Sequence, residues 1–130
     1  MRRVGAVDAR PSALAVVAAG GAAGALARWG ITATWPTVVG GAGWGTLAVN
    51  LTGCFLLGLL AARVEPDSLA RLGLGTGVLG GFTTFSTLMV ETDRGLSESR
   101  PALALGVLAV SLVGGVGLAW IGERIGERAA

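Results

Sequence analysis

Four long apolar stretches, separated by short polar segments, constrain this sequence more than any other feature. They cover approximately residues 12–33, 44–63, 68–92 and 101–122. Each is long enough for a helix that crosses a bilayer core of roughly 30 Å, which takes about 20 apolar residues. The apolar residues do not alternate with polar ones as they do in the strands of a membrane β-barrel. The sequence therefore predicts an all-α membrane protein with four transmembrane helices in a single domain, residues 1–130.

The composition fits a chain that lies in lipid. Hydrophobic residues make up 52% of the sequence and charged residues 14%, whereas soluble domains contain about 25% charged residues. A soluble fold of 130 residues could not bury so much apolar surface, because small domains leave a large share of their surface exposed. Lipid is the solvent that this composition predicts.

The residue types also limit the possible functions. The chain has no His and a single cysteine, Cys54, within an apolar stretch, so the usual pairs of nucleophile and base are missing. We therefore do not expect an enzyme. Ten basic residues, all arginine, are scattered along the chain and do not form the basic stripe that predicts a nucleic-acid partner.

The first apolar stretch has an alternative interpretation. Arg2 and Arg3 precede it, and Ala25-Leu26-Ala27 lies near its end, a pattern that also occurs in cleaved secretory signal peptides. Because three further apolar stretches follow, we interpret the first as a permanent transmembrane helix.

The third stretch is the least regular of the four. Five glycines occupy nine positions between Gly73 and Gly81, and four hydroxyl residues follow within residues 83–87. A Gly-Gly pair costs about 2 kcal/mol of helix propensity relative to Ala, which predicts a helix break at residues 80–84. Carbonyls freed at membrane depth are tolerated where they face protein or a cavity, and such carbonyls suit a cation. The alternative is an unbroken glycine-rich helix that its neighbours hold in place.

Polar side chains within the other stretches are the next candidates for function, because such groups at membrane depth usually mark a pathway or a partner. Arg28 either serves such a pathway or extends to the interface beside Trp29. Asn50 either lines a pathway or makes a structural bond between helices. Ser111 either contributes a free hydroxyl or bonds back to its own helix, which is the more common arrangement.

Three motifs resemble the CrcB/Fluc family of fluoride channels. They are GGAAGALAR at residues 20–28, GTLAVNLTGCF at residues 45–55 and GGFTTFST at residues 80–87. The resemblance implies four-helix subunits, with the third helix broken near its middle, that form antiparallel, dual-topology dimers. It implies two pores through which fluoride leaves the cytoplasm passively. It also implies a central, structural sodium ion that is not transported and is held by the backbone carbonyls of Gly80 and Thr83.

The resemblance assigns a fluoride pathway to particular residues. Asn50 and Phe85 occupy the positions of a pore-lining Asn and Phe, whereas Leu88 replaces the second pore Phe of the family. Ser86, Thr87 and Ser111 belong to a polar track, and Arg28 matches an Arg near the aqueous entrance. The family often has a Tyr on the fourth helix, and this sequence has none.

The distribution of arginines predicts an orientation in the cell membrane. Seven lie on the side of the two termini and the second loop, namely Arg2, Arg3, Arg10, Arg63, Arg71, Arg124 and Arg128. Three lie on the other side, namely Arg28, Arg94 and Arg100. The positive-inside rule then places both termini in the cytoplasm. A dual-topology homodimer should show almost no such bias, so an oppositely oriented paralogue is an alternative partner to a second copy of this chain.

Two other functions compete with a fluoride channel. A small multidrug-type transporter of four helices would need a membrane-embedded acid as proton carrier, and we expect every Asp and Glu of this sequence in a tail or a loop. A non-conducting partner subunit is the other alternative. The hydroxyl-rich GGFTTFST segment argues against a purely structural role, because packing alone does not require so many hydroxyls at depth.

Overall fold

The computed structural model describes residues 10–35 and 43–128. The first span is α1 (Pro11–Thr34) and the second is α2 (Trp44–Arg63). The third span comprises α3 (Leu69–Arg71), η1 (Leu72–Leu79), α4 (Gly80–Phe82) and α5 (Phe85–Ser97). The fourth comprises α6 (Pro101–Ala109), η2 (Val110–Gly114) and α7 (Gly115–Arg128). The η1 and η2 segments are π-helical, and no strand occurs within the described ranges.

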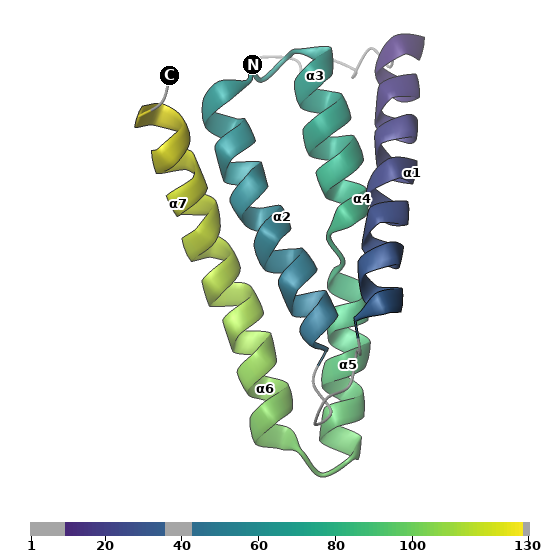
Figure 1. Ribbon diagram of the computed structural model, residues 1–130, viewed down its shortest axis with the longest axis vertical. Coiled ribbons are helices and arrows are strands. Elements are labelled where there is room, and N and C mark those ends of the chain that lie inside the picture. The colour runs from purple at the N-terminus through teal and green to yellow at the C-terminus, as the bar shows by residue number, and fades with distance from the viewer. Residues whose placement is uncertain (1–9, 36–42, 129–130) are drawn as a thin grey trace, which may run out of the picture.

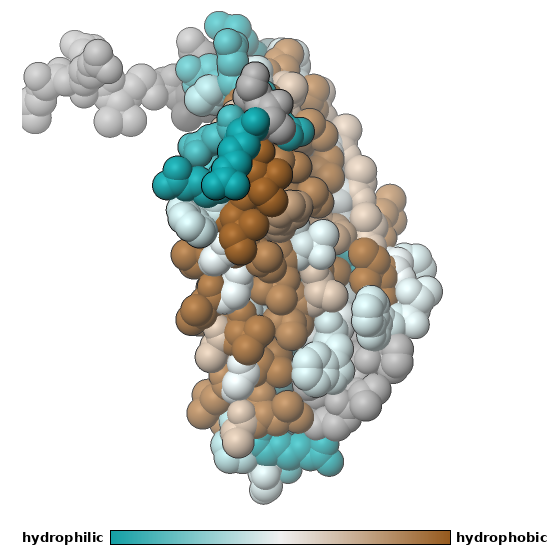
Figure 2. Space-filling view, turned by 60° about the vertical axis from the view of Figure 1, so that its left-hand side comes forward, coloured by the Kyte–Doolittle hydropathy of each residue, from teal (hydrophilic) through white to brown (hydrophobic). Residues whose placement is uncertain are grey.

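The four spans run alternately up and down. The start of α1, the loop between α2 and α3, and the end of α7 lie at one end of the bundle (Figure 1). All four spans are long and apolar enough to cross a membrane. Figure 2 shows an apolar band between hydrophilic ends. The predicted all-α membrane fold with four spans is thus confirmed.

Glycines allow the first span to pack closely on the third. A Cβ on Gly20 would collide with the carbonyl oxygen of Gly73, and one on Gly24 with that of Val78. Gly81 of α4 likewise lies against the backbone of Gly21. Such close approach provides dispersion contacts, which drive helix association in lipid in place of the hydrophobic effect. The Gly81 position of the glycine pair therefore serves helix packing.

The second span packs against α7 in the same way. Gly58 approaches the Ala119 carbonyl, and Cys54 lies against Gly115. Both contacts have the same sequence offset, as expected for two helices that run in the same direction. That offset places Ser111 at the level of Asn50, one turn before the contact of Cys54 with Gly115.

The buried apolar core is small and consists of Leu47, Val49, Leu88, Ala104 and Val107. Leu88 and Val107 form its centre, which joins α5 to the fourth span. Most large apolar side chains lie on the outside, as lipid permits.

The third helix is interrupted near its middle, within the predicted range of residues 80–84 and at its threonines, not at its glycines. Gly80, Gly81 and Phe82 are helical, whereas Thr83 (ψ 156°) and Thr84 (φ −147°, ψ 120°) are extended. β-Branched threonines adopt extended conformations readily, and the hydrogen bonds described below stabilise this one. An unbroken glycine-rich helix is excluded.

The third and fourth spans extend beyond their apolar stretches, to Ser97 and Arg128. The expectation that every acid lies in a tail or loop is therefore wrong for Glu91 and Asp93, which are part of α5, and for Glu123 and Glu127, which are part of α7. Loss of hydrophobicity does not end a helix where water solvates its polar side chains. The third span ends instead at a turn in which Ser99 has a φ of 60°.

Candidate functional site at the helix break

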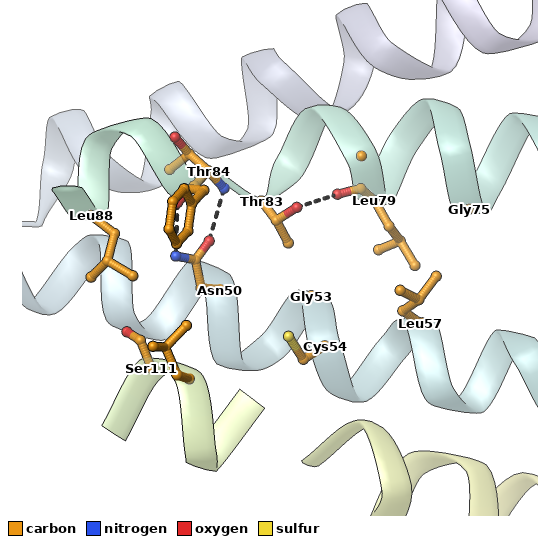
Figure 3. A pocket seen from close by; sticks show the side chains of 13 residues that line it. Asn50, Gly53, Cys54, Leu57, Gly75, Leu79, Thr83, Thr84, Leu88 and Ser111 are labelled. Atoms are coloured by element: carbon orange, nitrogen blue, oxygen red, sulfur yellow. Dashed lines mark hydrogen bonds between the residues drawn. The ribbon is translucent and has the colours of Figure 1, made fainter. Parts of the chain in front are cut away.

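The side chain of Asn50 holds the interrupted backbone of the third span. Its Oδ1 accepts a hydrogen bond from the Thr84 amide at 2.8 Å, and its Nδ2 donates to the Thr84 carbonyl at 2.9 Å (Figure 3). In a continuous helix the Thr84 amide would instead bond to the Gly80 carbonyl. Asn50 therefore makes the interhelical structural bond that was one of its two interpretations, and it diverts the helical donor away from Gly80. The second hydrogen of Nδ2 is still available as a donor.

Hydroxyls organise both sides of the break. The Thr83 hydroxyl donates to the Leu79 carbonyl at 3.0 Å (Figure 3). The Thr84 side chain caps α5 by accepting from the Thr87 amide at 3.3 Å. The hydroxyl of Thr84 also lies 3.0 Å from that of Thr87 and 3.3 Å from that of Ser86. The hydroxyls of Thr84, Ser86 and Thr87 thus form one connected network at the start of α5.

Arg28 reaches the break from the first span. Its Nε donates to the Gly81 carbonyl at 3.2 Å. A continuous helix would satisfy this carbonyl with the Phe85 amide, so the guanidinium replaces a bond that the break removes. The structure therefore shows the Arg28 side chain bonded to the third span beside the break.

A cavity of about 280 Å³ lies on one side of the break. The predicted site residues that line it are Asn50, Gly80, Thr83, Phe85, Leu88 and Ser111. Ser111 is 7% exposed, and its hydroxyl has no hydrogen-bond partner among the described residues. The expected bond back to its own helix is therefore not made. Its place opposite Asn50 leaves a polar group free in the cavity wall.

A second cavity, of about 560 Å³, lies on the other side of the break. The predicted residues Arg28, Ser86 and Thr87 line it, together with Thr46, Glu91 and Arg94. Thr84 lines both cavities. The break therefore separates two cavities whose walls carry hydroxyl, amide and guanidinium donors.

Sequence reasoning missed Glu91 and Thr46. The Thr46 hydroxyl, which is fully buried, donates to Oε1 of Glu91 at 2.8 Å, whereas Oε2 is buried without a described partner. A Cβ on Gly43 would collide with the Glu91 carboxylate, so this glycine makes room for it. Helical spacing could have identified Glu91 from the sequence, because it lies one turn after Thr87 and two turns after Thr84, on the same helix face.

Two predicted pathway residues have contrasting environments. Phe85 lines the smaller cavity, yet it is 64% exposed. Much of its surface therefore faces outward from the subunit. Leu88 is 2% exposed and packs in the core with Val107. Leu88 thus combines a packing role with a place in the cavity wall.

Carbonyl oxygens at the break are the candidate metal ligands. The described residues contain no cluster of three His, Cys, Asp or Glu side chains that could hold a metal ion. A metal at this site would be a hard cation with oxygen ligands.

Four spans, an interrupted third span and cavities with polar groups in their walls on both sides of the break define a multi-pass membrane protein of the channel or transporter class. Residues 15–123 match the family described as "CrcB-like protein, Camphor Resistance (CrcB)". The chain belongs to this CrcB family.

Curated relatives cover most of the chain. It is 47% identical to "Fluoride-specific ion channel FluC 2" of Thermobifida fusca, over 78% of each chain. It is 39% identical to "Fluoride-specific ion channel FluC 1" of Cutibacterium acnes, over 92% of this chain and 88% of the relative. It is 45% identical to "Fluoride-specific ion channel FluC" of Variovorax paradoxus, over 81% and 86%. These names describe ion channels and not enzymes, in agreement with the sequence prediction.

Proposed function

We propose that this protein is a fluoride-specific channel that passively exports fluoride and so lowers its cytoplasmic concentration. The main structural support is the pair of cavities that meet at Thr84, on either side of an interrupted helix. Both cavities border Thr84, so polar groups line the third span on either side of the break, where a continuous apolar helix would present none. The relatives named as fluoride-specific channels supply the identity of the ion.

The walls of this route have the chemistry that a small hard anion requires. Selectivity in a channel comes from groups that replace the hydration shell of the ion. The hydroxyls of Ser86, Thr87 and Ser111 and the free hydrogen of Asn50 Nδ2 are neutral donors. The edge of the Phe85 ring carries partial positive charge, and Arg28 supplies a full charge beside the larger cavity.

The protein functions, in our proposal, as an antiparallel dimer. The 64% exposure of Phe85 supports this assembly. The exposed part of the ring would contact the neighbouring subunit and form part of the wall of that subunit's cavity. The partner is either a second copy of this chain or an oppositely oriented paralogue.

The arginine distribution favours the paralogue. Among the described residues, Arg10, Arg63, Arg71, Arg124 and Arg128 lie at or near the end of the bundle that carries the start of α1 and the end of α7. Arg28, Arg94 and Arg100 lie toward the other end. Arg2 and Arg3 lie outside the described residues. We propose that both termini are cytoplasmic.

We further propose a structural sodium ion at the break, bound by the carbonyls of Gly80 and Thr83 from both subunits. Asn50 supports this assignment because it withdraws the Thr84 amide from Gly80. The extended backbone of Thr83 removes its carbonyl from the regular pattern of the helix. The ion would neutralise the carbonyl dipoles of the two subunits, whose helix breaks would meet at the centre of the dimer. It would not be transported.

Fluoride efflux from liposomes tests the channel directly. Purified chain alone in sodium buffer should release fluoride, read with a fluoride electrode, and should not release chloride. Absence of fluoride efflux from well-inserted protein would favour a heterodimer with a paralogue. Co-reconstitution with the opposite-topology paralogue should then restore efflux. Absence of fluoride efflux in the presence of that paralogue would refute the assignment of fluoride as the transported ion. Recovery of one polypeptide inserted in both orientations would refute the heterodimer.

A matched pair of variants tests the pathway. Ser111→Ala removes the unpartnered hydroxyl from the cavity and should slow fluoride efflux. Thr52→Ala removes a hydroxyl from an exposed position on α2 that lines neither cavity, and should leave efflux unchanged. Equal rates for both variants and the wild type would exclude Ser111 from the pathway.

Glu91 supplies an acid that the competing exporter hypothesis needs. Because Glu91 is bonded to Thr46 and shares its cavity with Arg28 and Arg94, we favour a role in the entrance of the channel. Fluoride flux that requires a proton gradient in liposomes would favour the exporter instead.

A further inference from the structure

An apolar groove lies between α2 and the third span and shares one lining residue, Leu79, with the smaller cavity at the break. It has a volume of about 380 Å³ and is lined by Leu56, Leu59, Leu60, Arg63, Val64, Leu74, Val78 and Leu79. All of these residues except Arg63 are aliphatic. The groove therefore has one charged group at the edge of an otherwise hydrocarbon surface.

The groove opens on a different side of α2 from the smaller cavity. Gly53, Cys54 and Leu57 line that cavity, whereas Leu56 and Leu60 line the groove. At 100° per residue, the α2 residues of the two sets point in directions about 120° apart. A subunit that covers the polar cavity therefore leaves the groove to another occupant.

The depth of Arg63 matches the position of lipid phosphates. The 20 residues of α2 from Trp44 to Arg63 span about 30 Å, the thickness of the hydrocarbon core. With Trp44 at one interface, Arg63 lies at the opposite one. Leu56, Leu59 and Leu60 then lie one to two turns deeper, at the level of acyl chains.

The charge of Arg63 is free for a ligand. Arg63 is exposed and makes no ion pair with any described residue. The neighbouring Arg71 differs, since its Nη1 donates to the carbonyls of Leu60, Ala61 and Val64. A guanidinium binds phosphate oxygens with paired, charge-assisted hydrogen bonds.

We propose that the groove binds one anionic glycerophospholipid, with an acyl chain along the leucines and the phosphate on Arg63. An anionic headgroup suits the site better than a zwitterionic one, because the site holds no described carboxylate to attract a choline cation. The bound lipid would join α2 to the third span on a face about 120° from the one that carries the smaller cavity, where we propose the subunit interface. This inference does not depend on the identity of the transported ion.

Native mass spectrometry of the intact assembly tests the proposal, with phosphatidylglycerol titrated against phosphatidylcholine in neutral detergent. We expect one tightly retained phosphatidylglycerol per chain and weaker binding of phosphatidylcholine. Arg63→Gln should weaken phosphatidylglycerol binding by about tenfold or more, as expected for loss of a charge-assisted bond. Arg124→Gln is the matched control, since Arg124 pairs with Glu127 outside the groove.

A second variant separates loss of charge from loss of fold. Leu74→Trp introduces a larger side chain at a 48% exposed position in the groove wall, and should reduce retention while Arg63 is intact. Equal retention of both lipids, or no effect of either variant, would overturn the proposal. So would disulfide crosslinking between subunits of a Leu60→Cys variant on a Cys54→Ala background, because a second copy of the chain would then fill the groove.

Discussion

Replacement of Asn50 by leucine should destabilise the protein, because Asn50 holds the interrupted backbone of the third span. The substitution keeps the size of the side chain but removes both hydrogen bonds to Thr84, a residue that is 9% exposed. The Thr84 amide would then be buried without a partner, which costs about 1–3 kcal/mol.

The Thr84 carbonyl should contribute less to this loss. As the residue that precedes α5, Thr84 can use its carbonyl to accept the first bond of that helix. Loss of the second donor then costs only the net value of one hydrogen bond, about 0.5–1.5 kcal/mol. The expected total is about 2–4 kcal/mol, although polar contacts in membranes often contribute less than in water.

Reversible unfolding in mixed micelles of neutral detergent and dodecyl sulfate provides the measurement, followed by circular dichroism at a fixed protein concentration. Thr52→Leu is the control, because Thr52 lies on the same helix, is exposed and makes no hydrogen bond with its hydroxyl among the described residues. If Asn50→Leu lowers the free energy of unfolding by less than about 0.5 kcal/mol, or by no more than the control does, Asn50 does not stabilise the break.

Four further predictions concern packing, charge and the proposed cation. Gly58→Val should prevent close packing of α2 on α7 and lower the midpoint of thermal unfolding, whereas Gly117→Val, at a glycine with open space around it, should leave the midpoint unchanged. Arg28→Lys keeps a charge beside the larger cavity but loses the bond to Gly81, so fluoride efflux should fall less than with Arg28→Gln; equal loss in both would show that charge at this position is irrelevant. Leu88→Ala should cost about 2–5 kcal/mol in chemical unfolding because it empties part of the core, and a cost below 1 kcal/mol would contradict its burial. Replacement of sodium by a large organic cation should weaken the subunit interface, seen as dissociation on size-exclusion chromatography, and an unchanged elution profile would refute the structural role of sodium.

The arrangement at the break links stability to the proposed transport route. Asn50 and Arg28 each satisfy a backbone group that the break would otherwise leave unpaired, and each also lines one of the two cavities. Variants of either residue are therefore expected to change folding and fluoride flux together. Ser111, whose hydroxyl has no described partner, is the position at which flux should change with little change in folding.

The sequence by itself determined the four spans and the interrupted third helix. Hydrophobic stretches of membrane length leave no alternative to helices, because every backbone group in lipid must be satisfied within the segment. The motifs also identified the polar residues at the break that line the two cavities, since GGFTTFST concentrates hydroxyls that packing does not need.

Only the tertiary structure decided where these residues act. The break lies at Thr83 and Thr84 because Asn50, distant in sequence, offers a better partner than the helix itself. The sequence alone predicts every acid in a tail or a loop, yet Glu91 lies within α5 and its carboxylate accepts a hydrogen bond from Thr46. Local hydrophobicity reports the edge of the hydrocarbon core, whereas helix ends and side-chain partners depend on contacts between spans.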